Sequence, residues 1–212
     1  MRWAGSLYGL PAACNLNRRD HWVSKNRLEA FSDGVIAIVI TIMVMQISVP
    51  EGGALRDLLS LIPGIVCYAI SFLMIAIYWN NHHHLTQIVA QVNGKVLWSN
   101  LFFLFLLSLL PLTTNWAQKT KFEYIPVIVY ASSYLLCTIA YLGLERTLMK
   151  ESVLENVSAL KDSHRKEWAT VILHVVSIVF AAFHLWQLAF VSMGVIAMIW
   201  VVPELRIEKI YK

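Results

Sequence analysis

The chain has 212 residues, of which 58% are hydrophobic and 14% charged, and its formal net charge at neutral pH is +4. A soluble domain is on average about a quarter charged and less than half apolar. This composition therefore excludes an ordinary soluble protein and indicates an integral membrane protein with no room for a soluble catalytic domain. The positive charge does not indicate a nucleic-acid partner, because the basic residues lie between the apolar runs.

Six apolar segments follow one another along the chain, each about as long as the roughly 20 residues that a helix needs to cross a bilayer. We predict an all-α membrane protein with six transmembrane helices, near residues 28–48, 57–79, 96–116, 124–148, 168–184 and 186–202. Pro63 and Gly64 lie in the first turns of the second segment, and Pro111 should kink or break the third. Only His184 and Gln187 interrupt the fifth and sixth segments, which predicts a tight hairpin there.

The positions of Lys and Arg predict the orientation of these helices. On one side of the membrane, the connections contain three basic residues: Arg56, Lys119 and Lys121. The other side contains the remaining Lys and Arg, in the N-terminal arm, the other connections and the C-terminus. The positive-inside rule then places both termini in the cytoplasm, as an even number of spans allows. The predicted organisation is a cytoplasmic arm (1–26), a transmembrane domain (27–205) and a C-terminal tail (206–212).

One long polar connection, residues 149–167, interrupts the transmembrane domain on the cytoplasmic side. Its apolar residues recur at helical spacing among charges: Val153, Leu154, Val157 and Leu160. This pattern predicts a helix that lies against the membrane or a neighbouring subunit. A solvated connector is the alternative.

A carboxylate lies at the start of the first apolar segment. Asp33 directly precedes the apolar run 34–45, and Arg27, Glu29 and Ser32 lie within two helical turns of it. An ionisable residue in a membrane segment is costly unless it is paired or hydrated. We therefore expect Ser32 and Asp33 to find partners within the helix bundle. A hydrogen-bonding anchor between helices is favoured for Asp33 over direct ion coordination.

The first segment has a second, apolar face. At about 100° per residue, one stripe of the predicted helix carries Phe31, Gly34, Ile38, Ile42 and Met45, with Thr41 on its flank. Ser32 and Asp33 point away from this stripe. Such a stripe normally indicates packing or lipid contact, so the helical wheel by itself does not predict a pore.

Three consecutive histidines, His82, His83 and His84, follow the second segment. Adjacent residues on a helix are about 100° apart, so all three cannot face one ion. The H-E-x-x-H pattern of zinc enzymes does not occur, and we expect neither a metal nor another cofactor. The favoured interpretation is that one histidine reaches the Ser32–Asp33 pair, and a pH-sensing role stays open.

These motifs resemble the signature of the transmembrane protein 175 family, which contains the endosomal and lysosomal potassium channel of animals and its bacterial relatives. The resemblance is carried by Arg27-x-x-x-Phe31-Ser32-Asp33-Gly34 before an isoleucine-rich span with Thr41, by Tyr78-Trp79-x-x-His82-His83, and by Leu110-Pro111-Leu112-Thr113-Thr114. It covers nearly the whole chain as one six-helix unit, as in the bacterial relatives, whereas the animal protein has two such units.

The resemblance implies a homotetramer in which the first helix of each subunit lines a central pore. It also implies that an isoleucine on this helix forms a hydrophobic constriction and that a nearby threonine influences cation preference. By position after the motif these are Ile38 and Thr41, and the helical wheel adds Ile42 and Met45. The sequence has no TVGYG-type filter. The expected protein is a potassium-permeable channel of modest selectivity in a bacterial plasma membrane, with K⁺, other monovalent cations and lipid as its partners.

Two other functions remain as alternatives. A cation- or proton-coupled secondary transporter would use Asp33 and the histidines, although a carboxylate near one end of its span does not favour a midplane binding site. A membrane-embedded hydrolase or metalloenzyme would need a nucleophile–base pair or a set of ligands, and the sequence indicates neither.

Overall fold

The computed structural model describes residues 24–87, 89, 92–151 and 163–201. The helices of this part of the chain are α1 (Lys25–Met45), α2 (Leu55–Ser60), α3 (Ile62–Gln87), α4 (Gly94–Ser108), α5 (Leu110–Lys119), α6 (Tyr124–Lys150), α7 (Ser163–Ala182) and α8 (Trp186–Val201). The prediction of an all-α membrane protein is confirmed.

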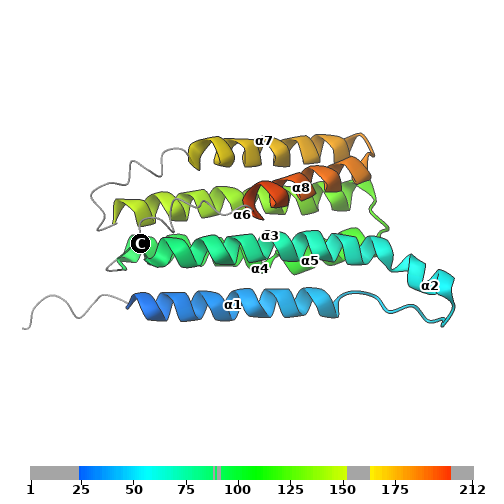
Figure 1. The fold of residues 1–212 in the computed structure, drawn as a ribbon, viewed down its shortest axis with the longest axis horizontal. Coiled ribbons are helices and arrows are strands. Elements are labelled where there is room, and N and C mark those ends of the chain that lie inside the picture. Colours follow the sequence, from blue (N-terminus) through cyan, green and yellow to red (C-terminus); the bar gives the residue numbers. More distant parts are fainter. Residues whose placement is uncertain (1–23, 88, 90–91, 152–162, 202–212) are drawn as a thin grey trace, which may run out of the picture.

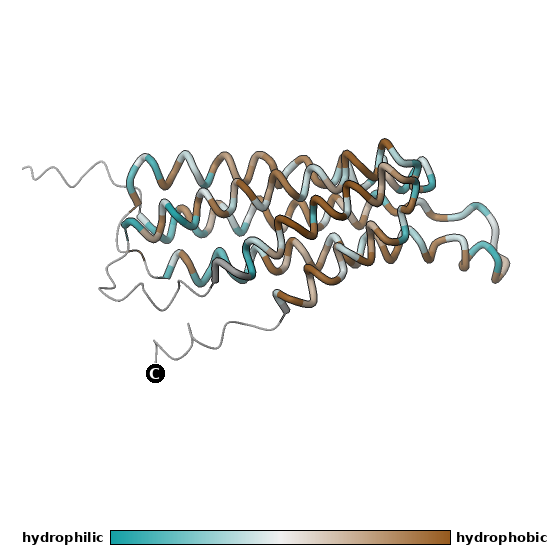
Figure 2. Tube along the Cα trace, turned by 90° about the horizontal axis from the view of Figure 1, so that it is seen from above, coloured by the Kyte–Doolittle hydropathy of each residue, from teal (hydrophilic) through white to brown (hydrophobic). Residues whose placement is uncertain are grey.

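The eight helices combine into six rods that run up and down one bundle (Figure 1). Helix α2 leads into α3, and α4 leads into α5, so each of these pairs forms one rod. Four rods have the length and composition of membrane spans: Lys25–Met45, Leu55–Gln87, Gly94–Lys119 and Tyr124–Lys150. Helix α8 is apolar but shorter. Hydrophobic residues fill the middle of the rods, and hydrophilic residues gather at their ends (Figure 2).

The predicted breaks fall where proline or a left-handed residue occurs. Helix α4 ends at Ser108 and α5 begins at Leu110, with Pro111 in its first turn. The proline has no backbone N–H to continue the hydrogen-bonding pattern, which explains the break. Between α7 and α8, His184 adopts a φ of 62°. The amide of Leu185 donates to the carbonyl oxygen of Phe180 at 2.9 Å, which closes the predicted hairpin.

The polar connection is shorter in the structure than the sequence indicates. Helix α6 continues to Lys150, and α7 begins at Ser163, ahead of the apolar residues that start at 168. A hydropathy window detects only the apolar part of a helix, whereas the helix itself continues into its charged end. The predicted amphipathic stripe from Val153 to Leu160 lies outside the described residues.

Helix α1 packs against α3, α4 and α5, whereas α6 packs against α4, α5 and α7 and is much more buried. Hydroxyl groups bond to one another inside this bundle: Tyr130 to Ser71 at 2.9 Å and Tyr78 to Thr138 at 2.8 Å. Interhelical hydrogen bonds of this kind hold membrane helices together where water is absent. Helix α1 therefore forms one edge of the bundle, with part of its surface uncovered.

Candidate functional site

Helix α1 has one buried and one exposed face. The buried face carries Leu28, Ser32, Ile36, Val39 and Met43 at intervals of three or four residues. Side chains at this spacing share one side of an α-helix, and here that side packs on the bundle.

The exposed face of α1 contains all the residues of the predicted stripe: Phe31, Gly34, Ile38, Ile42 and Met45, together with Thr41. Ile38 is 59% exposed and Met45 is 83% exposed. A Cβ atom added at Gly34 would meet no other atom within 4 Å. Since the chain leaves much of this face uncovered, water, lipid or another copy of the chain must cover it.

Ser32 is the centre of a buried hydrogen-bonded cluster, here called the Ser32 cluster, which consists of Ser32, Asn100 and His82. The Ser32 hydroxyl donates to the Leu28 carbonyl oxygen at 2.8 Å and accepts from Nδ2 of Asn100 at 3.0 Å. The Oδ1 atom of Asn100 lies 2.8 Å from Nε2 of His82. An amide oxygen only accepts, so Nε2 of His82 carries the proton in this arrangement.

The Ser32 cluster joins three helices. Ser32 lies on α1, Asn100 on α4 and His82 on α3, and all three side chains are buried. The ring of His82 also stacks on Phe103 of α4, with 6.4 Å between ring centroids. Fully paired polar groups in a low-dielectric interior fix one geometry, because any rotation leaves a group unpaired. The cluster therefore sets which face of α1 turns inward.

Asp33 bonds to a different partner. The indole N–H of Trp79 on α3 donates to Oδ1 of Asp33 at 2.8 Å. Asp33 lies a little over two turns into α1, because the helix begins at Lys25, before the apolar run. The donor to this carboxylate is thus a neutral indole, and no Lys or Arg of the described residues forms a salt bridge with it. This geometry suits an anchor between α1 and α3.

A third contact joins the same two helices closer to the start of α1. Nδ1 of His83 donates to the Glu29 carboxylate at 2.6 Å. Lys25 reaches Gln87 with 2.9 Å between Nζ and Oε1. The ring of His83 stacks on Trp79 at 6.5 Å, so this contact adjoins the Asp33 bond.

The residues of the family motif fall into two groups in the structure, one between helices and one on the exposed face of α1. The motif residues Ser32, Asp33, Trp79, His82 and His83 bond between helices, whereas Arg27, Phe31 and Gly34 lie on the exposed face of α1. Arg27 and Phe31 line a shallow hollow beside Asn100. Among the histidines, His82 reaches Ser32 through Asn100, and His83 reaches Glu29 instead.

Sequence reasoning missed Asn100. Its signal is present, since Asn100 is the one amide in the apolar run 96–112. A side chain of this kind inside a membrane span needs a partner, but the sequence does not say which helix supplies it. No group of three or more His, Cys, Asp or Glu that could hold a metal occurs within the described ranges.

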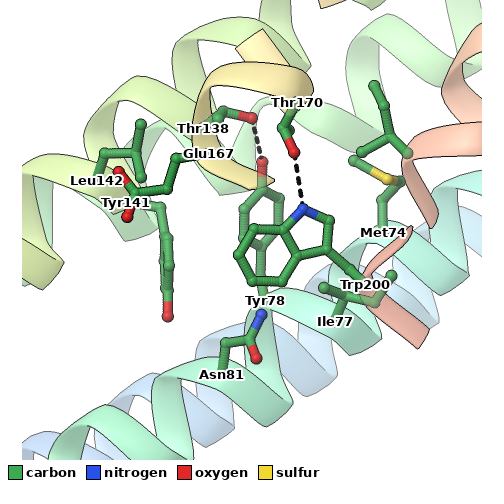
Figure 3. Close-up of a pocket in the computed structure, with 11 residues that line it drawn as sticks. Met74, Ile77, Tyr78, Asn81, Thr138, Tyr141, Leu142, Glu167, Thr170 and Trp200 are labelled. Carbon is green, nitrogen blue, oxygen red and sulfur yellow. Dashed lines mark hydrogen bonds between the residues drawn. The ribbon is translucent and has the colours of Figure 1, made fainter. Parts of the chain in front are cut away.

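A separate pocket lies between α3, α6, α7 and α8 (Figure 3). Its hydrogen bonds join Tyr78 to Thr138 at 2.8 Å and the Trp200 indole N–H to Thr170 at 2.7 Å. Glu167 of α7 also contributes to the lining. No residue of α1 lines this pocket, so it is distinct from the exposed stripe and the Ser32 cluster.

Comparisons with known proteins agree with the arrangement of these motifs. The family model described as the endosomal/lysosomal potassium channel TMEM175 matches residues 27–111. A protein from Chryseobacterium sp. (strain P1-3), named as a potassium channel, is 41% identical over 194 residues, which cover 90% of this chain and 99% of that protein. A Gallus gallus protein, named as the endosomal/lysosomal proton channel TMEM175, is 33% identical over 117 residues, 48% of this chain and 23% of that protein.

The fold has a solved counterpart. The crystal structure titled as a lysosomal potassium-selective channel TMEM175 homolog from Chamaesiphon minutus matches with a TM-score of 0.74 and 26% identity. The match covers 84% of this chain and 96% of that one. With the near-complete match to the Chryseobacterium relative, these findings show that this chain belongs to the TMEM175 potassium channel family.

Proposed function

We propose that this chain is one subunit of a potassium-permeable channel whose central pore is lined by the exposed face of α1. The observation that carries the proposal is the division of α1 into two faces. One face is held against α3 and α4 by the Ser32 cluster, and the other leaves Ile38, Thr41, Ile42 and Met45 exposed. We infer K⁺ as the permeant ion from the names of the bacterial relatives, which are potassium channels.

Four subunits around one axis would bring four copies of this face together. Ile38 would then form a ring of apolar side chains, with Ile42 and Met45 further along the same stripe. A ring of this kind stops ions by dewetting, and a small widening admits water and ions. Selectivity over sodium would be modest, because no cage of carbonyl oxygens replaces the hydration shell. Thr41, the hydroxyl on the flank of the stripe, would influence cation preference.

The proposed location is a bacterial plasma membrane with both termini in the cytoplasm. In this orientation Arg27 and the Glu29–His83 contact lie at the cytoplasmic end of the pore. This orientation follows from the positive-inside rule, because most Lys and Arg residues lie in the N-terminal arm, the C-terminus and the connections on the same side of the membrane. No enzymatic step and no cofactor form part of the proposal.

The alternative, a transporter that uses Asp33 and the histidines, fits the geometry less well. Transport would need these groups in an accessible site that changes partners. Instead, His82 is buried and bonded to Asn100, and Asp33 accepts from Trp79. Both arrangements tie helices together.

Ion flux through purified protein in liposomes separates the two functions. A channel predicts fast electrogenic K⁺ flux that needs no counter-ion gradient and does not saturate at low millimolar concentrations. Slow, saturable flux that requires a proton or sodium gradient would overturn the proposal in favour of a transporter. A pH-sensitive dye inside the same liposomes measures proton passage, the activity in the name of the Gallus gallus relative.

A further inference from the structure

Two adjoining hollows lie at the end of the bundle where α5 ends and α8 begins. The first, here called the α3–α8 groove, is apolar and is lined by Ile62, Val66, Ile70, Phe190, Val191 and Gly194, among others. The second, here called the mouth, is lined in part by Ser48, Ser60, Gln118 and Lys121. Both hollows are also lined by Pro63, Phe122 and Trp186, so the groove leads into the mouth.

An uncommon backbone turn forms the boundary between the two hollows. Lys121 and Phe122 are consecutive non-glycine residues with φ angles of 53° and 65°. The Phe122 amide donates to the Ala117 carbonyl oxygen at 2.8 Å, and its ring stacks on Trp186 at 4.9 Å. The turn buries Phe122 as a wall of the groove and leaves Lys121 exposed at the mouth. Left-handed non-glycine residues cost free energy and gather at ligand-binding and switch regions.

The length of the groove matches one leaflet of a bilayer. From Ile62 to Ile70, α3 rises about 12 Å over eight residue steps, and half of a hydrocarbon core is about 15 Å. Trp116, Tyr124 and Trp186 lie at the mouth end of the helices. These aromatic residue types favour the membrane–water interface. In a bilayer the groove would therefore lie at the depth of acyl chains and the mouth at the depth of headgroups.

We propose that the α3–α8 groove holds one acyl chain of a phospholipid whose phosphate is bound by Lys121. Among the residues that line the mouth in the described part of the chain, Lys121 is the one charged side chain, and no carboxylate is present to oppose an anion. Gly194 has open space around its Cβ position, which gives the groove its depth. An apolar groove that leads to one cation matches the acyl chain and phosphate of a lipid, whereas the face of a second subunit would not need a cation at the mouth. No residue of the exposed stripe of α1 lines either hollow.

Two matched pairs of variants test the site. Gly194→Phe fills the groove, and Gly143→Phe is its control, because a Cβ atom at Gly143 also meets nothing within 4 Å and Gly143 lies on α6. Lys121→Gln removes the cation at the mouth, and Lys119→Gln removes a neighbouring exposed cation that does not line it. Delipidated protein is titrated with phosphatidylglycerol or phosphatidylcholine of identical acyl chains, and bound lipid is counted by native mass spectrometry.

The proposal predicts one tightly held phosphatidylglycerol per subunit in the wild type. Gly194→Phe should weaken its binding at least tenfold, and Lys121→Gln should remove the preference for phosphatidylglycerol over phosphatidylcholine. Both controls should bind as the wild type does. Equal lipid binding by Gly194→Phe and Gly143→Phe would overturn the proposal. A change of oligomeric mass in Gly194→Phe would also overturn it, because a second copy of the chain would then be the occupant. If Gly194→Phe does not fold, Val191→Phe fills the groove from an exposed position and carries the same expectation.

Discussion

The side-chain amide of Asn100 donates to the Ser32 hydroxyl at 3.0 Å and thereby fixes the rotation of α1 about its own axis. Ile38 follows Ser32 by six residues, which places it about 240° further round the helix at ~100° per residue. With Ser32 held inward against α4, Ile38 must point out of the subunit. A buried polar contact between α1 and α4 thus determines which residues the proposed pore presents to ions.

Asn100→Ala should destabilise the protein by about 1–3 kcal/mol, because it leaves the buried Nε2 of His82 without its acceptor and removes the donor to the Ser32 hydroxyl. Ser108→Ala is the control, since Ser108 is exposed on the same helix and its hydroxyl donates to the Phe105 carbonyl oxygen within α4. Thermal unfolding in detergent measures both variants. Equal melting temperatures for the two would show that the Ser32 cluster does not hold α1 in place.

Asp33 and Trp79 should act as one pair. Asp33→Ala and Trp79→Phe each remove the 2.8 Å hydrogen bond, so the double variant should be less destabilised than the sum of the two single variants. The expected coupling is about 1 kcal/mol, typical of contacting residues. A double-mutant cycle in thermal or denaturant unfolding checks this expectation. Strict additivity, or a stable Asp33→Ala protein that assembles normally and differs only in ion selectivity, would contradict the anchor role.

Gly34→Leu distinguishes a face that meets other subunits from one that meets lipid. Within the subunit the new side chain has open space, and leucine stabilises a helix by up to about 1 kcal/mol relative to glycine. Subunit stability should therefore be unchanged or higher, whereas K⁺ flux should fall because four leucines crowd the pore axis. Gly143→Leu on α6 serves as the control in the liposome assay. Undiminished flux in Gly34→Leu would place this part of α1 away from the pore.

The sequence predicted the rods of the bundle well because hydropathy and proline positions act locally. Pro111 interrupts its rod in the structure, and the hairpin at His184 closes as expected. The apolar segment near residues 168–184 begins later than α7, which starts at Ser163, because the first turn of the helix is charged rather than apolar. These errors concern the ends of helices, where composition changes before the helix stops.

The sequence predicts that the polar residues of α1 have partners in the bundle, but it does not identify most of those partners. The cost of an unpaired polar group in a membrane predicts that the face with Ser32 and Asp33 turns toward the bundle, yet the helical wheel does not say which residues pair with them. Asn100 is 68 residues from Ser32, and His82 is 18 residues from Asn100. Such pairings depend on how three helices rotate and stack against each other, and periodicity within one helix carries no information about that.

The measurement that most directly tests the account is K⁺ flux into liposomes that contain wild type, Ile38→Asn or Ile172→Asn. Ile172 is the matched control, because it is 57% exposed on α7 while Ile38 is 59% exposed on α1. An asparagine at the constriction should let water enter, so Ile38→Asn should raise basal K⁺ flux at least about tenfold, equivalent to a barrier lower by about 1.4 kcal/mol. Ile172→Asn should conduct as the wild type does. Wild-type flux from a well-folded Ile38→Asn protein would contradict the assignment of Ile38 to the pore.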